Sequence, residues 1–285
     1  MFVVVLFIQV VAGNVFAESS SRRVPEIMER SGLWKTYTIF DPCNLKKPGK
    51  RTVSCAQLKR EGNHESGYYS IAPHNQFLVW CDMDTDGGGW TIIQRRSENE
   101  KGDARFERSR EEYERGFYGD VSSYWIGNDN LHALTSHPDK AQVLRIELTK
   151  ENEQTIIVRY GKFTVGSKYD GYVLTCGDYS SPNGTGYDGL TLHSGYPFNV
   201  MKESSSRDLC SKSRLSGGWW FSPFGCISSN LNGRKFNGSV PQDNMGHAIT
   251  WYVRYDRSSS QILYESVEMK VRDADYEFCT GKMAK

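Results

Sequence analysis

The amino-acid sequence predicts a sheet-rich fold that also contains a few short helices. Aromatic residues make up 13% of the 285 residues, and the chain has 27 glycines. Such a chain can bury a sizeable core and still make many tight turns, which favours a sheet over a helical bundle. From Thr36 onward, short alternating apolar segments end in turn residues, as strands usually do.

Five segments are predicted to be strands, because alternating apolar residues dominate them and turn residues bound them. They are residues 67–71, 77–80, 90–94, 143–147 and 155–160. The glycine-rich residues 86–89 and the Ser-Pro-Asn-Gly run at 181–184 are predicted turns.

Helices are predicted over residues 54–60 and 110–115, and a third short helix is expected over 25–30. The helix at 110–115 has glutamates in its first turn. It precedes an aromatic cluster that we expect in the core, made of Phe117, Tyr118, Tyr124 and Trp125.

Residues 175–236 have few periodic elements and many Gly, Ser and Asn residues. A loop region of that length in a compact domain usually binds a ligand or is disordered. Three consecutive aromatic residues, Trp219, Trp220 and Phe221, and two cysteines argue against disorder. The sequence therefore predicts that this region contributes to binding.

The amino end resembles a secretory signal. Residues 1–11 are almost wholly apolar, and Val15 and Ala17 suit signal-peptidase cleavage before Glu18. A membrane anchor is the alternative, but the apolar run is shorter than the roughly 20 residues that span a bilayer. We therefore expect residues 1–17 to be removed and the protein to be secreted, without membrane insertion.

Export places the seven cysteines in an oxidising compartment, where they are expected to form disulfides. The formal net charge of +1 and the lack of a long basic stretch argue against nucleic acid as a partner. Residues 18–45 form a short polar segment with neither Gly-X-Y repeats nor sustained heptads. This segment is neither a collagen stalk nor a long coiled coil.

Several motifs follow one another in a fixed order along most of the chain. They read CDMDTDGGGWTIIQRR at 81–96, YWIGNDNLHAL at 124–134, GGWW at 217–220, SNLNG at 229–233, ITW at 249–251 and VEMKVR at 267–272. On these motifs the chain resembles fibrinogen-related domains, the family that includes the ficolin and tachylectin lectins of innate immunity.

The resemblance implies an α+β domain over residues 46–275, followed by a tail at 276–285. Its central twisted antiparallel sheet would be flanked by short helices and joined to a loop-rich C-terminal binding lobe. The resemblance also implies two disulfides, one joining Cys55 to Cys81 and one joining Cys210 to Cys226.

Three cysteines remain outside this pattern. Cys43 and Cys279 lie near opposite ends of the domain, and we hypothesise that they pair because chain termini often meet in a compact fold. Cys176 is then odd, and it is either a buried thiol or a contact to a second chain.

Lectins of this family recognise acetyl groups in a pocket beside the second disulfide. Aromatic side chains can cover the acetyl methyl, while backbone N–H groups bind its carbonyl oxygen. The family's Trp-Trp-Tyr becomes Trp219, Trp220 and Phe221 here, and its Cys-His pair becomes Cys226 and Ile227. The complete set of predicted ligand-binding residues is Trp219, Trp220, Phe221, Cys226, Ile227, Asn230, Lys235 and His247.

Two members of that set need a further remark, because one differs from the lectin residue at its position and the other has two possible interpretations. Lys235 stands where the lectins often have a tyrosine, although Phe236 adjoins it. His247 precedes the strand predicted at 249–251 and is either near the pocket or an ordinary surface histidine.

Calcium-binding members of the family carry an Asp-X-Asp-Asn-Asp run before the second disulfide. In this chain Lys202 and Ser204 stand where aspartates are expected, and only Glu203 and Asp208 remain acidic. Since an ammonium group repels a divalent cation, we expect this remnant to bind calcium weakly or not at all, and no other cofactor is implied. Asp82, Asp84 and Asp86 resemble the opening of an EF-hand but lack its glutamate, so they predict a turn.

No catalytic motif of a known class is present, so we expect a binding protein rather than an enzyme. Two sequons, at Asn183 and Asn237, predict a glycoprotein.

Two binding functions remain. One is recognition of N-acetylated glycans on microbial surfaces, and the other is binding of a protein receptor, as in angiopoietin-like proteins. The altered acidic run and Cys-His pair favour a receptor, whereas the lack of a coiled coil favours the lectin, which we prefer. A single weak pocket would require multivalency, and hence a homo-oligomer, to hold a microbial surface.

Overall fold

A computed structural model describes the chain in the following parts: residues 26–28, 36–38, 52–100, 106–120, 122–136, 141–150, 155–184, 186–201, 210, 215–223, 226, 228–251 and 261–277. The chain forms two compact units, Met1–Asn44 and Leu45–Lys285. The predicted signal peptide at 1–17 lies outside the described residues.

In the first unit, β1 (Glu26–Met28) pairs with β2 (Thr36–Thr38) in an antiparallel ladder. The helix expected over 25–30 is therefore wrong. A single isolated helical turn is marginal in water, whereas pairing with a second strand satisfies the backbone N–H and C=O groups.

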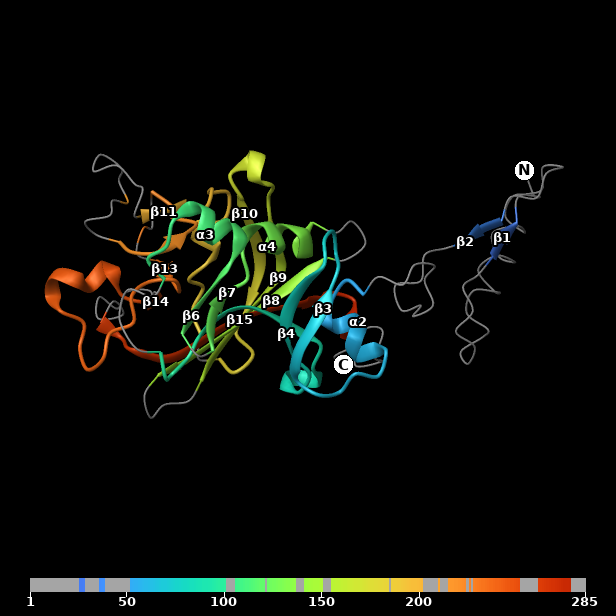
Figure 1. Cartoon of the computed structure of the whole chain (residues 1–285), viewed down its shortest axis with the longest axis horizontal. Coiled ribbons are helices and arrows are strands. Elements are labelled where there is room, and N and C mark those ends of the chain that lie inside the picture. The colour runs from blue at the N-terminus through green and yellow to red at the C-terminus, as the bar shows by residue number, and fades with distance from the viewer. Residues whose placement is uncertain are drawn as a thin grey trace, which may run out of the picture. The chain divides into compact units, whose positions relative to one another are not determined.

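The second unit is built on a nine-stranded antiparallel sheet (Figure 1). Its main path runs β10-β9-β8-β15-β5-β4-β3, and β7 pairs with both β5 and β6. All five predicted strands are confirmed, although several extend further than expected. The strands are β3 (Gly67–Ile71), β4 (Phe77–Asp82), β5 (Trp90–Arg96), β6 (Phe117–Asp120), β7 (Ser123–Trp125), β8 (Gln142–Lys150), β9 (Ile156–Val165), β10 (Leu174–Ser180) and β15 (Tyr264–Asp273).

Strand β15 comes from the end of the domain yet lies in the middle of the sheet, between β8 and β5. Its Lys270 is buried, with 1% of the side chain exposed, and its Nζ lies 2.9 Å from Asp82 Oδ2 and 3.0 Å from Glu147 Oε2. A buried ammonium is tolerable only when carboxylates compensate its lost hydration. These acidic partners, on β4 and β8, therefore make a charged residue compatible with the sheet interior.

Both predicted helices are confirmed. In α2 (Cys55–Arg60), the Ser54 side chain caps the first turn by accepting from the Gln57 N–H. In α3 (Arg110–Arg115), Ser109 and Glu112 form a reciprocal capping box. A third helix, α4 (Asn128–Thr135), was not expected, because it begins at Gly127 without a capping side chain.

The C-terminal lobe contains two short antiparallel ladders. β11 (Asn199–Val200) pairs with β12 (Gly218–Trp219), and β13 (Ser229–Asn230) pairs with β14 (Thr250–Trp251). Figure 1 places β11, β13 and β14 together at the end of this unit opposite α2. The predicted α+β class, with a large antiparallel sheet, short helices and a loop-rich lobe, is confirmed.

The two disulfides implied by the resemblance are present. Cys55 joins Cys81, linking α2 to β4, and Cys210 joins Cys226 in the C-terminal lobe, each with Cα atoms 5.5 Å apart. On the loop-entropy model, a bridge closing a loop of about 15 residues contributes roughly 3 kcal/mol.

Cys176 is a buried free thiol, which was the first of the two alternatives predicted for it. Burial raises its pKa to about 12. Cys43 and Cys279, which we expect to pair, lie outside the described residues.

Candidate binding lobe

The predicted aromatic wall of the lobe is buried in the core. Trp219 and Trp220 are each 0% exposed, and Phe221 is 4% exposed. The Trp220 ring packs with its centroid 5.2 Å from the rings of both Trp219 and Phe198. The two tryptophans and Phe221 therefore belong to the buried core of the lobe, and Cys226 is half-buried against it.

Hydrogen bonds fix Trp220 at both its side chain and its backbone. Its indole N–H donates to the carbonyl oxygen of Tyr172 at 2.8 Å. Its own carbonyl oxygen lies 2.6 Å from Nδ1 of His193. Because both groups are buried, these bonds are shielded from competing water.

His193 links two segments of the lobe. Its Nε2 accepts from the backbone N–H of Ser229 at 3.1 Å, so its Nδ1–H must donate to Trp220. Burial lowers the pKa of His193 to about 4, and the ring is therefore neutral at neutral pH. His193 was not among the predicted site residues, because a lone histidine in a loop region carries no local signal of its two distant partners.

Asn230 and its neighbour Asn232 connect the two ladders. The Asn230 Nδ2 donates to Ser216 O at 2.9 Å, and its Oδ1 accepts from the Asn232 N–H at 3.2 Å. Asn232 Nδ2 donates to Gly218 O at 2.9 Å. Since Asn230 is 0% exposed, its amide holds the loop rather than facing solvent.

Lys235 was predicted to contact ligand, but its side chain turns inward. Its Nζ donates to the carbonyl oxygens of Ser97, Glu98 and Glu265 at 2.5, 3.1 and 2.6 Å. Burial lowers its pKa. The lysine therefore connects the lobe to the ends of β5 and β15. This structural role corrects the prediction that Lys235 contacts ligand.

His247 is half-buried at the end of the 3-10 helix Gln242–His247. Its Nδ1 lies 3.1 Å from Asn244 Oδ1, and its carbonyl oxygen accepts from the hydroxyl of Ser216 at 2.6 Å. The ring thus lies near the surface of the lobe, while its backbone belongs to the same network as Asn230.

Three predicted residues, Ile227, Glu203 and Asp208, lie outside the described residues, so the predicted weak calcium site stays a prediction. Within the described parts of the chain, no group of three or more His, Cys, Asp or Glu residues is arranged to hold a metal ion.

The aspartate series at 82–86 forms the predicted turn. Asp82 Oδ1 accepts from the N–H groups of Asp84 and Thr85 at 3.0 and 2.9 Å. Burial raises the pKa of Asp82, but the ammonium of Lys270 and the hydrogen bonds from Thr85 outweigh burial and hold it at about 2. These carboxylate oxygens are thus engaged with protein donors.

The two sequons differ in their surroundings. Asn237 is exposed, whereas Asn183 is half-buried and its Nδ2 donates to Thr155 O at 2.8 Å. Asn183 lies in the turn predicted at 181–184, where the Gly184 N–H donates to Ser181 O at 3.0 Å.

Comparison with known proteins identifies the fold family. The model of the family described as fibrinogen beta and gamma chains, C-terminal globular domain, matches residues 51–274. The chain belongs to this family.

Its curated relatives have different names and lengths. Mouse angiopoietin-4 is 38% identical over 228 residues, which cover 78% of this chain and 42% of the relative. Mouse fibrinogen-like protein 1 is 34% identical over 245 residues, covering 80% and 74%. Human ficolin-3 is 38% identical over 195 residues, covering 67% and 62%. The chain thus spans less than half of angiopoietin-4.

Solved structures agree on the fold. The fibrinogen-like globe domain of human ANGPTL2 is 27% identical and superposes with a TM-score of 0.68, over 78% of this chain and 99% of that one. Lamprey fibrin D-dimer, complexed with the peptide Gly-His-Arg-Pro-amide, superposes with a TM-score of 0.65 over 96% of this chain and 84% of that one. That likeness, at 23% identity, concerns the fold alone.

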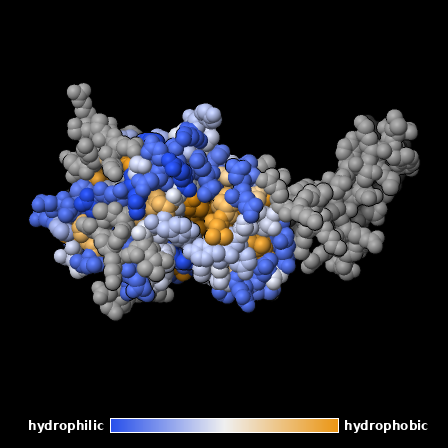
Figure 2. Space-filling model, viewed as in Figure 1, coloured by the Kyte–Doolittle hydropathy of each residue, from blue (hydrophilic) through white to orange (hydrophobic). Residues whose placement is uncertain are grey.

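This fibrinogen-like domain also has an exposed aromatic face on β3, β4 and β6. Tyr68, Leu78 and Tyr118 are 51%, 57% and 62% exposed and border a hollow of about 150 Å³. Figure 2 shows a hydrophobic hollow between the places that β7 and β4 occupy in Figure 1. The expectation that Tyr118 is a core residue is therefore wrong, because alternation along β6 turns its ring to solvent.

Proposed function

We propose that this chain is a secreted lectin that binds N-acetylated glycans on microbial surfaces and acts in innate immunity. The observation that supports it best is the link through His193, which ties the backbone of Trp220 to that of Ser229 within the disulfide-closed lobe. A site whose backbone is fixed before binding loses less entropy when a ligand arrives. The 38% identity with human ficolin-3 agrees with this proposal.

In the proposed complex, the acetyl methyl packs against the ring of Phe221 and the Cys210–Cys226 disulfide. Backbone N–H groups of the lobe bind the acetyl oxygen, and Trp219 and Trp220 support the site from below. The family's tyrosine hydroxyl is missing at Phe221, so one polar contact is lost relative to the lectins.

A glycan array with acetylated and de-acetylated competitors tests the lectin function. We expect binding that N-acetylglucosamine inhibits and glucosamine does not. Phe221→Ala should abolish it, whereas Tyr169→Ala, which changes a fully exposed ring outside the lobe, should leave it intact. Failure to bind any acetylated glycan would exclude the proposal. A chelator should have no effect, since we also propose that the acidic remnant at Glu203 and Asp208 does not hold calcium.

Binding of a protein receptor is the second candidate. It is favoured by the exposed face of Tyr68, Leu78 and Tyr118, since contiguous exposed apolar surface often marks a protein interface. The 38% identity with angiopoietin-4 is consistent with it. Capture of one cell-surface protein that Tyr118→Ser abolishes and Phe221→Ala does not would support this function over the lectin.

We further propose that residues 1–17 are removed on export, that Cys43 pairs with Cys279, and that Asn183 and Asn237 carry glycans. The protein would act by binding and not by catalysis. Mass spectrometry of secreted protein under non-reducing conditions tests the cleavage, the disulfide and the glycans together, and a mature chain that keeps residues 1–17 would contradict the proposed cleavage.

A further inference from the structure

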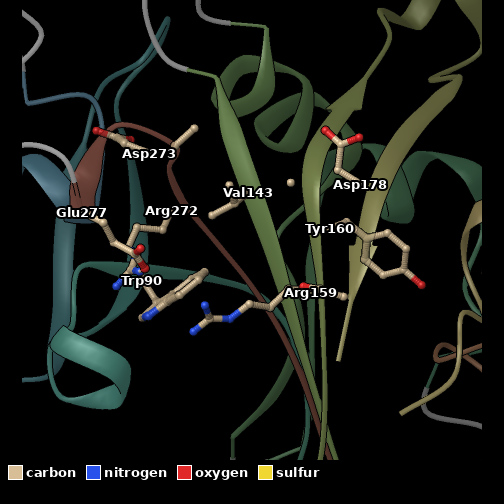
Figure 3. A pocket seen from close by; sticks show the side chains of 11 residues that line it. Trp90, Val143, Arg159, Tyr160, Asp178, Arg272, Asp273 and Glu277 are labelled. Carbon is tan, nitrogen blue, oxygen red and sulfur yellow. The ribbon is translucent and has the colours of Figure 1, made fainter. Parts of the chain in front are cut away.

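A second cavity lies on the sheet, outside the C-terminal lobe. It has a volume of about 190 Å³ and is lined by residues of β5, β8, β9, β10 and β15 and of the segment after β15. In Figure 3, Arg159 extends from β9 toward the ring of Trp90, with Arg272 and Glu277 beside that ring and Asp178 on the opposite side. The lining therefore includes five charged side chains, two of which are arginines.

Two arginine Nε–H donors in this lining have no acceptor among the described residues. The Arg272 side chain is only 2% exposed, and both of its terminal nitrogens are used, on Asp86 O at 2.8 Å and Glu277 Oε1 at 2.9 Å, but its Nε is unpaired. The Arg159 Nη2 bonds to the Asp86 carboxylate, and its buried Nε is also unpaired. Leaving a buried donor without an acceptor is costly, and more so for a charged group.

Three arginines lie close together beside this cavity. Arg145, Arg159 and Arg272 converge on the carboxylate of Asp86, with Arg145 and Arg272 each 3.9 Å from Asp86 Oδ2. Arg145 and Arg272 also pair with Glu147 and Glu277, at 2.5 and 2.9 Å. Burial, with a smaller contribution from the charges of Arg159 and Arg145, lowers the pKa of Arg272 to about 10 although the carboxylate of Glu277 raises it. An added anion would relieve this repulsion.

Three carboxylates also border the cavity, and they limit the charge of a ligand. Each has a cationic partner: Asp178 lies 3.2 Å from Lys162, Asp273 lies 2.9 Å from Arg60, and Glu277 pairs with Arg272. Their presence disfavours a doubly charged group such as phosphate or sulfate. A singly charged carboxylate matches two N–H donors with the least repulsion.

We propose that this cavity binds the carboxylate of a small ligand, whose oxygens accept from the Nε–H groups of Arg159 and Arg272. The cavity is smaller than the roughly 300–1,000 Å³ of sites for drug-sized molecules, so the ligand is of monosaccharide size or less. A sugar acid and the C-terminal end of a peptide both supply this chemistry. The site is independent of the glycan or receptor function of the lobe.

Calorimetric titration of the full chain tests the proposal and separates the two sources. The probes are glucuronate and an N-acetylated dipeptide with a free C-terminus, and glucose and the C-terminally amidated dipeptide are their uncharged counterparts. We expect saturable binding of at least one carboxylate and none of its counterpart. Arg159→Gln should weaken this binding at least tenfold, and Arg115→Gln, an identical change at an exposed site on α3, should not.

Asp178→Asn gives a test in the opposite direction. Asp178 has a left-handed backbone (φ 56), which asparagine tolerates, so the fold should be kept. Removal of its charge should tighten carboxylate binding severalfold, an effect that a merely structural role would not produce. Thermal unfolding of each variant excludes misfolding. Equal binding of charged and uncharged probes, preference for sulfate, or weaker binding by Asp178→Asn would overturn the proposal.

Discussion

The ring of His193 connects the carbonyl oxygen of Trp220, 2.6 Å from its Nδ1, to the backbone N–H of Ser229, 3.1 Å from its Nε2. One of these segments contains Trp219 and Trp220, and the other is the strand β13. One neutral imidazole joins them. Protonation would place a second N–H against the Ser229 N–H, where no acceptor exists. The lobe therefore depends on His193 staying neutral.

Acid should destabilise the domain in a defined pH window. The pKa of His193 is lowered from 6.5 to about 4 in the folded state, so between these values only the unfolded chain binds the proton. The contribution of neutral His193 to the free energy of unfolding is fully present above pH 6.5. It falls as the pH drops toward 4, by about 3 kcal/mol in all. Urea unfolding at pH 7, 5.5 and 4 measures it. In His193→Gln this part of the pH slope should vanish, and an unchanged slope would contradict the assignment.

Lys235 should contribute to stability and not to ligand contact. Lys235→Met would remove the ammonium that donates to three partly buried carbonyl oxygens, those of Ser97, Glu98 and Glu265, and should lower the free energy of unfolding by about 1–3 kcal/mol. Lys162→Met is the control, since that lysine is 73% exposed and its ion pair contributes little. Chemical denaturation compares the two, and equal stabilities would show that the inward contacts of Lys235 are not important.

Much of the sheet could be predicted because its signals are local. Alternating apolar residues marked strands such as β3 and β9. The helix predicted at 54–60 begins at its capping residue Ser54, and glutamates mark the first turn of the helix predicted at 110–115. Helix α4 carries no such signal, since Gly127 precedes it without a side-chain cap. The central position of β15 depends on pairing with β8 and β5, which are far away in the sequence.

The candidate site was harder to predict, because a motif fixes the identity of residues but not the direction of their side chains. Trp219 and Trp220 were expected to line a pocket, but both are buried in the core. Lys235 stands where the lectins often have a tyrosine, and it points away from the lobe surface, toward the carbonyl groups of Ser97, just after β5, and of Glu265 in β15. His193 belongs to no motif, and only the fold brings it to Trp220.

The thiol of Cys176 should be unreactive in the native protein. Only the thiolate attacks a disulfide reagent, and burial raises the pKa of this thiol to about 12. Titration with Ellman's reagent at pH 8 should detect almost no thiol before denaturation and one thiol per chain afterwards. Rapid reaction of the native protein would contradict the buried position, and three thiols after denaturation would instead refute the proposed pairing of Cys43 with Cys279.

The turn that leads into Trp219 should tolerate only glycine at position 217. Gly217 has a left-handed backbone (φ 68), and an added Cβ would overlap the carbonyl oxygen of Asn232. Gly217→Ala should therefore lower the free energy of unfolding by about 2 kcal/mol or more. Gly177→Ala is the matched control, because a Cβ there would meet no atom within 4 Å, and strand β10 should be unchanged or slightly stabilised.

Hydrogen exchange locates the effect of the Gly217 change. The N–H of the next residue, Gly218, donates to the hydroxyl of Tyr113 at 3.0 Å, so displacement of this turn should expose that amide. We expect faster exchange in residues 215–223 of Gly217→Ala, with the sheet amides of β8 and β15 still protected. Uniformly faster exchange would instead mean that the lobe and the sheet unfold as one cooperative unit, in which case a binding lobe with its own local stability does not exist.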